Sequence, residues 1–172
     1  TAVIEIGKEQ GIRVDWQLDD DRLPRQMGWT RDPIAPHLRV IPAPKDEYKI
    51  NGRIPTLVVG EGYRRKETPV VIGDFIETSP LIQDLNFDAL ESLELGGIAI
   101  PEEVQPVLRG TDEQVWAAQS SSPPLAFVPG LPTGNDDVGG RVSAILFFNA
   151  LRWLLQERSF PPLYTLTTPN QP

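Results

Sequence analysis

The sequence predicts an α/β domain in which a sheet of short strands packs against few helices. Residues 138–159, VGGRVSAILFFNALRWLLQERS, form the most apolar stretch of an otherwise polar chain and carry a helical pattern. Several four- or five-residue apolar runs are rich in β-branched side chains and are bounded by glycine or proline, which is typical of buried strands. The 18 prolines in 172 residues leave room for few long elements.

The N-terminal third, residues 1–55, predicts an irregular or β-rich arrangement. Residues 2–6 (AVIEI) read as a short strand. Residues 11–18 alternate apolar and polar side chains, which predicts a strand with one buried face. Residues 19–36 are polar and contain three prolines, so a long connection is expected, and no amphipathic helix is visible between Gly7 and Val58. The buried face of the second strand would carry Ile12, Val14, Trp16 and Leu18.

The central part predicts a series of short strands. Residues 38–42 (LRVIP), 56–60 (TLVVG) and 69–73 (PVVIG) are strand candidates, the last two buried. Between these two, GEGYRRKE predicts an exposed turn, with the basic residues Arg64, Arg65 and Lys66 at its tip. A small strand is expected at residues 98–100 (IAI).

The C-terminal part predicts three further strands and then the helix. Val107 and Leu108 lie in one strand, a turn follows at residues 109–113, and Val115 to Ala118 form the next strand. Residues 124–130 (PLAFVPG) predict another short strand, reached through the loop at Ser120, Ser121 and Ser122. Asn135 to Asp137 precede the long helix and offer N-terminal caps and favourable negative charge.

The long apolar segment predicts a core helix and not a membrane span. Its apolar run between Arg141 and Gln156 has 14 residues, interrupted by Asn149 and Arg152, whereas crossing a bilayer takes roughly 20. Phe160-Pro161-Pro162 cannot continue the helix. We therefore predict one α/β domain over residues 1–160 and a proline-rich tail over residues 161–172.

Charge and composition narrow the classes of partner. The formal net charge of −8 argues against nucleic acid and anionic membrane surfaces, which both require a positive footprint. The chain has no cysteine, which removes disulfides, thiolate metal sites and cysteine nucleophiles. It begins at Thr1 without methionine or a signal segment, so we expect a fragment of a longer protein.

The order of features in the C-terminal half resembles a known family. Residues 69–118, 124–130 and 135–157 contain a Ser79-Pro80-Leu81 segment, a Leu-Arg-Gly turn, an acidic loop and a closing Asn-Ala-Leu-Arg-Trp-Leu helix. This resembles the glutamine amidotransferase-like domain of BatA-type bacterial membrane proteins, which also carry a von Willebrand factor A module. The resemblance implies a flavodoxin-like sheet in an extracytoplasmic (periplasmic) part of a membrane-anchored protein, with other proteins as partners.

The resemblance also bears on catalysis. Glutamine amidotransferases attack with a cysteine on a tight strand-to-helix turn. Gly60-Glu61-Gly62 has the shape of such a turn, but its central residue is glutamate, and a surface turn is the competing interpretation. We therefore expect a non-catalytic module for protein–protein interaction or ligand recognition, with no catalytic, cofactor-binding or metal-binding residues. Two alternatives remain: a carboxylate- or metal-dependent hydrolase using Glu61 and Asp74, and a β-rich accessory interaction module.

The remaining polar candidates each have a structural interpretation. His37 is the only histidine, and a structural or surface role is expected for it. The acidic residues Asp15 and Asp19 to Asp21 predict a solvated turn, with calcium binding as the alternative, although the EF-hand spacing is absent. Asp136 and Asp137 pose the same choice between helix capping and cation binding.

The four tryptophans divide by context. Trp16, Trp116 and Trp153 lie on apolar faces of predicted elements and are expected in the core. Trp29 lies in the predicted long connection, so it is the candidate for an exposed contact.

Overall fold

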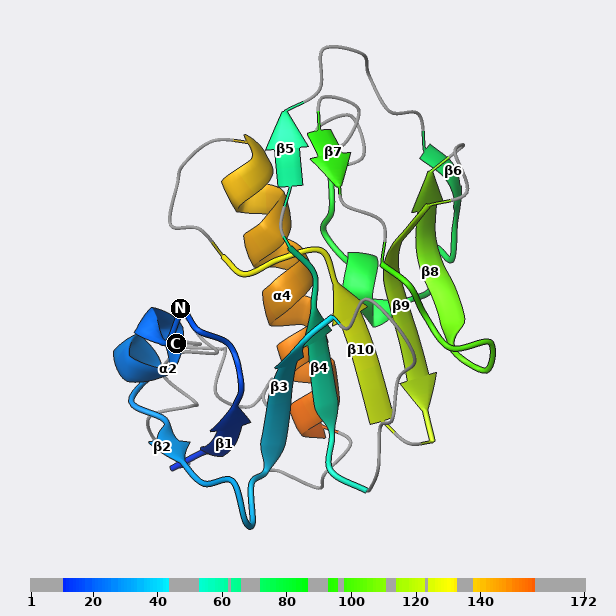
Figure 1. The fold of residues 1–172 in the computed structure, drawn as a ribbon. Coiled ribbons are helices and arrows are strands. Elements are labelled where there is room, and N and C mark those ends of the chain that lie inside the picture. Colours follow the sequence, from blue (N-terminus) through cyan, green and yellow to red (C-terminus); the bar gives the residue numbers. More distant parts are fainter. Residues whose placement is uncertain are drawn as a thin grey trace, which may run out of the picture.

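The protein is described by a computed structural model at residues 11–43, 53–61, 63–65, 72–86, 93–95, 98–110, 114–122, 124–132 and 138–156. In this part of the chain an eight-stranded mixed sheet has the order β2-β1-β3-β4-β10-β9-β8-β6, and helix α4 packs against it (Figure 1). A strand-rich α/β class is therefore confirmed. The elements are β1 (Arg13–Trp16), α2 (Arg22–Met27), β2 (Thr30–Arg31), β3 (Leu38–Pro42), β4 (Thr56–Val59), β6 (Ile72–Phe75), β8 (Gln105–Gly110), β9 (Val115–Ser121), β10 (Pro124–Val128) and α4 (Val138–Gln156).

The sheet has a parallel half and an antiparallel half. Strands β2, β1, β3, β4 and β10 run in one direction. Strands β10, β9, β8 and β6 are joined as antiparallel neighbours. The carboxyl ends of the five parallel strands therefore meet at one edge, called here the carboxyl edge, where ligands of open α/β sheets bind.

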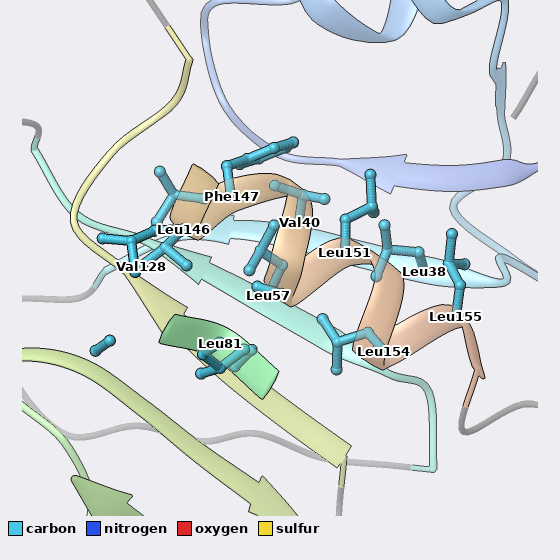
Figure 2. Packing of buried hydrophobic residues seen from close by; sticks show 14 of the residues in the cluster. Leu38, Val40, Leu57, Leu81, Val128, Leu146, Phe147, Leu151, Leu154 and Leu155 are labelled. Atoms are coloured by element: carbon cyan, nitrogen blue, oxygen red, sulfur yellow. The ribbon is translucent and has the colours of Figure 1, made fainter. Parts of the chain in front are cut away.

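Helix α4 forms the main core, as its apolar pattern predicted. Its buried side chains include Leu146, Phe147 and Leu151, while Arg141 and Arg152 are exposed on the polar face. Figure 2 shows the labelled leucines of α4 packed over residues of β3, β4 and β10, namely Leu38, Val40, Leu57 and Val128. Burying a leucine side chain is worth about 1.5–3 kcal/mol, so each of these contacts stabilises the fold. No helix in the described ranges is long and apolar enough to cross a membrane.

A short 3-10 helix, η1 (Pro80–Ile82), packs beside α4 over β8. The Ser79 hydroxyl accepts a hydrogen bond from the backbone N–H of Leu81 at 3.2 Å and lies 3.2 Å from Oε1 of Gln119 in β9. Leu81 and Ile82 are buried in the same core cluster as α4. The Ser-Pro-Leu segment thus covers the part of the sheet that α4 leaves open.

The predicted long connection at residues 19–36 is wrong, because it contains helix α2 and strand β2. Pro24 is the third residue of α2 and lies in its first turn. Backbone N–H groups of the first turn have no acceptor within the helix, so proline, which lacks an N–H, is tolerated there. Gly28 ends the helix in the left-handed conformation, with φ of 67°. Pro24 and Met27 are buried, and Met27 belongs to the same core cluster as Val14 and Trp16 of β1.

The exposed turn predicted at residues 60–67 is wrong at residues 63–65. Tyr63–Arg65 form β5, which pairs antiparallel with β7 (Leu93–Leu95) in a separate two-stranded sheet. In Figure 1 this pair stands beyond the carboxyl end of β4. Arg64 and Arg65 therefore belong to a paired strand, because a partner distant in sequence supplies the hydrogen bonds.

The small strand predicted at residues 98–100 is also wrong. The segment is irregular, although the N–H of Ile98 donates to the carbonyl of Val115 at 3.0 Å. Ile98 and Val104 are buried in a second cluster with Val58 and Phe127. Because side chains alternate along β4 and β10, this cluster lies on the sheet face opposite α4, and the segment serves as its cover.

Several predictions concern residues outside the described part. They are the strand at residues 2–6, the start of the strand at residues 69–73, Lys66, Gly62, the caps at Asn135 to Asp137, and the tail at residues 161–172.

Candidate functional site

The elbow-like turn lies at the carboxyl edge, directly after β4. The N–H of Gly60 donates to the carbonyl of Val128 in β10 at 2.9 Å. A Cβ at Gly60 would lie 2.6 Å from the carbonyl oxygen of Pro129, so this close approach requires glycine. Glu61 is exposed, and the chain continues into β5 and not into a helix. A nucleophile elbow is a strand-to-helix turn, so the geometry here is that of a surface turn.

The carboxylates of the hydrolase alternative lie far apart. Glu61 follows β4, and Asp74 lies in β6, four places away in the sheet. At about 4.8 Å per strand this separation is roughly 19 Å, so Glu61 and Asp74 do not form one site. Across the described ranges, no group of three or more histidine, aspartate or glutamate side chains could hold a metal ion.

Trp29 is buried, which corrects the prediction of an exposed contact. Its side chain is 7% exposed and belongs to the main core cluster. Its ring centroid lies 6.5 Å from that of Trp16, with the planes tilted by 58°. The backbone N–H of Trp29 donates to the carbonyl of Pro24 at 3.0 Å, directly after the end of α2 at Gly28, and the indole packs into the core beside Trp16.

The acidic run after β1 is paired with arginines. Asp20 accepts two hydrogen bonds from the Arg22 side chain, at 2.7 and 3.0 Å, and one from the Arg22 backbone N–H at 3.1 Å. These side-chain and backbone hydrogen bonds lower the pKa of Asp20 to about 2. Asp21 pairs with Arg25 at 2.7 Å. These two carboxylates therefore neutralise arginines of α2 itself.

Another ion pair joins β1 to β3 on the face opposite α4. Asp15 Oδ2 lies 3.0 Å from Arg39 Nε and also accepts from Gln17 Nε2 at 2.9 Å. The side chains of Asp15 and Arg39 are 12% and 24% exposed. This pair is better shielded from water than Asp20 with Arg22, whose side chains are 42% and 79% exposed.

Residues 32–37, named here the crossing loop, carry the chain from β2 across β1 to β3. Asp32 Oδ1 accepts from the backbone N–H groups of Ile34 and Ala35, both at 3.0 Å. These hydrogen bonds lower the pKa of Asp32. Arg13 in β1 donates from Nε to the carbonyl of Ala35 at 3.0 Å and lies 3.6 Å from Asp32 Oδ2. The loop is therefore fixed at both ends and in its middle.

His37 closes the crossing loop onto β1. The backbone N–H of Arg13 donates to His37 Nδ1 at 3.1 Å, and the backbone N–H of His37 donates to the Arg13 carbonyl at 2.9 Å. His37 is half-buried and directly precedes β3. In this contact the His37 Nδ1 acts as a hydrogen-bond acceptor.

The tip of the crossing loop is apolar. Ile34 is 90% exposed and is flanked by exposed Pro33 and Ala35. Among the described residues the other exposed large hydrophobic is Phe75, 44% exposed, in the edge strand β6. Sequence reasoning overlooked Ile34, although the pattern Asp-Pro-Ile-Ala-Pro was a signal: aspartate caps the turn and the prolines restrict it.

Together these features define a strand-rich α/β domain whose carboxyl edge ends in a surface turn and whose crossing loop presents an apolar tip. No family model matches the chain, and no curated protein matches it.

Proposed function

We propose that this chain is a non-catalytic protein-interaction module and that the crossing loop is its contact surface. The observation that carries the proposal is the 90% exposure of Ile34 on a loop held by Asp32 and Arg13. A single exposed apolar side chain is ordinary. What distinguishes Ile34 is the fixed backbone beneath it, which removes the ordering cost that a flexible loop incurs on binding.

The partner suggested by this surface is a protein with an apolar pocket. Interface energy concentrates in a few anchors that fill pockets and are ringed by contacts that exclude water. Pro33 and Ala35 widen the apolar tip on either side of Ile34, and the half-exposed Arg13 lies at its base.

The fold offers support for the glutamine amidotransferase-like resemblance. The five parallel strands, taken in chain order, have the spatial order 2-1-3-4-5, which is that of flavodoxin-like domains. We propose a reduced flavodoxin-like domain, with α2 and α4 packed in one core cluster and an irregular segment covering the other face. The chain has no cysteine to act as an amidotransferase nucleophile, so we propose a binding role for this domain.

A photo-crosslinking residue at position 34 tests the contact surface. The full-length parent protein, expressed in its own cells, should give one reproducible adduct from position 34 and none from a matched probe at Arg152, an exposed residue of α4. The purified partner should then bind the Ile34→Asp variant at least about tenfold more weakly, while Arg152→Ala binds normally. Equal affinity for both variants contradicts the proposal.

The resemblance further leads us to propose an extracytoplasmic position in a membrane-anchored parent. The full-length gene product tests this directly. Flanking transmembrane helices or a von Willebrand factor A module in the same chain are expected. A parent protein that lacks both would contradict this part of the proposal and leave the interaction surface to be judged by crosslinking alone.

A further inference from the structure

The imidazole of His37 accepts a hydrogen bond that a backbone carbonyl would normally accept in a β-sheet. Gln17 N–H donates to the carbonyl of Val40 in the parallel pairing of β1 with β3. In a parallel ladder every second residue of one strand donates to every second residue of its neighbour. By this repeat the N–H of Arg13 would donate to the carbonyl of Pro36. The Arg13 N–H instead donates to His37 Nδ1 at 3.1 Å. A titratable side chain thus completes the first rung of the β1–β3 ladder.

We propose that His37 is a pH-sensitive latch that holds the crossing loop to β1 only while its imidazole is neutral. A backbone N–H is always a donor, so Nδ1 must be unprotonated and the proton of the neutral ring must sit on Nε2. Protonation places a second N–H at Nδ1, directed at the N–H of Arg13. The hydrogen bond is then lost, and the two donors face each other.

The charged groups around His37 give the protonated ring an alternative partner. One of these groups is Asp32 of the crossing loop, whose charge interacts with that of His37, and the Arg13 side chain of β1 lies 3.6 Å from the same carboxylate. Farther along the same face of β1 and β3, Asp15 and Arg39 pair with each other at 3.0 Å. Two backbone N–H groups keep Asp32 ionised where histidine titrates. The imidazolium is therefore drawn toward Asp32 and away from the Arg13 N–H.

Release of the latch alters the surface that carries Ile34. Asp32 fixes the loop tip by accepting from Ile34 and Ala35 N–H, and an imidazolium competes for the same carboxylate. The tip is then no longer preorganised, so partner binding weakens in acid. This consequence rests on the proposed function, whereas the latch itself does not.

Because the chain has one histidine, NMR of the intact ¹⁵N-labelled protein reports on the latch without overlap. At about pH 7.5 the imidazole ¹⁵N shifts should show the proton on Nε2. The exchange protection of the Arg13 amide, corrected for the intrinsic rate, should be at least about tenfold greater at pH 7.5 than at pH 5. A proton on Nδ1 at pH 7.5, or equal protection of Arg13 at both values, overturns the proposal.

The His37→Asn variant provides the matched control. Asparagine Oδ1 keeps an acceptor near the position of Nδ1 and does not titrate, so protection of the Arg13 amide should persist at pH 5. The same acid loss in His37→Asn and in the wild type would show that another group is responsible, and the latch would be rejected. If Arg13 protection switches while affinity for the crosslinked partner does not change, the latch stands and the proposed contact surface fails.

Discussion

Asn149 in α4 donates a hydrogen bond from Nδ2 to the carbonyl oxygen of Leu81 at 3.1 Å, across 68 residues of sequence. The same amide donates to the carbonyl of Gln83 at 2.8 Å. One of these carbonyl groups lies within η1 and the other directly follows it. The next residue, Asp84, has a φ of 62°, in the left-handed region. One polar side chain on the core helix therefore fixes the segment that covers β8.

Replacing Asn149 with alanine should reduce the free energy of unfolding by about 1–3 kcal/mol, because the Leu81 and Gln83 carbonyls both lose their donor. Urea denaturation followed by circular dichroism measures this change. Arg152→Ala on the exposed face of the same helix is the control, with an expected change within about 0.5 kcal/mol. A loss no larger in Asn149→Ala than in the control would show that η1 is held by apolar packing alone.

Gly60→Ala should destabilise the fold by about 1–3 kcal/mol, because the new Cβ meets the Pro129 carbonyl oxygen at 2.6 Å. The obstacle is backbone in the neighbouring strand end, which cannot rotate away as a side chain can. Thermal unfolding compares this variant with Glu61→Ala, whose exposed side chain should matter little. An unchanged melting temperature in Gly60→Ala would mean that β4 and β10 separate readily at the carboxyl edge.

The Asp15–Arg39 pair should show a favourable coupling free energy of about 1 kcal/mol in a double-mutant cycle with Asp15→Asn and Arg39→Met. Its side chains are mostly shielded, at 12% and 24% exposed, so solvent screens them less than an open surface pair. Chemical denaturation of the four proteins gives the coupling. The matched cycle on Asp20 and Arg22 should give a smaller value, and the reverse ranking would contradict the assignment.

The carboxyl group of Asp20 should titrate with a pKa of about 2, because hydrogen bonds from Arg22 stabilise its charged form. The folded-state pKa lies below the ordinary value of 3.8. The stabilisation is therefore complete above that value and is lost as the pH falls through about 2. Carboxyl ¹³C NMR measures the titration. In Arg22→Ala the midpoint should rise toward 3.8, and an unmoved midpoint would refute Arg22 as the cause.

The sequence predicted best those elements whose signals are local. The helix beginning at Val138 was visible because its apolar residues recur with helical spacing and its run is too short for a membrane span. Strands β3, β4 and β10 were visible as short apolar runs, since buried parallel strands show little alternation. In each case the residues that define the element are neighbours in the chain.

The missed elements depend on contacts between distant segments. Helix α2 has six residues, too few to be stable alone, and Pro24 within it reads as a breaker unless it falls in the first turn. The signal that could have identified it was Pro24 near its start together with Gly28 just past its end. The prediction that Trp29 is exposed was wrong for the same reason. Trp29 was assigned to a loop, and a loop residue was expected at the surface.

The sequence by itself determined the α/β class and the core helix α4. It also determined that the chain has no cysteine nucleophile. Only the tertiary structure decided that Glu61 and Asp74 lie apart, that Trp29 is buried, and that Ile34 stands exposed on a clamped loop. The physical reason is that apolar periodicity is set by neighbours along the chain. The pairing of Asn149 with Leu81, or of Arg13 with His37, arises only when strands and helices meet.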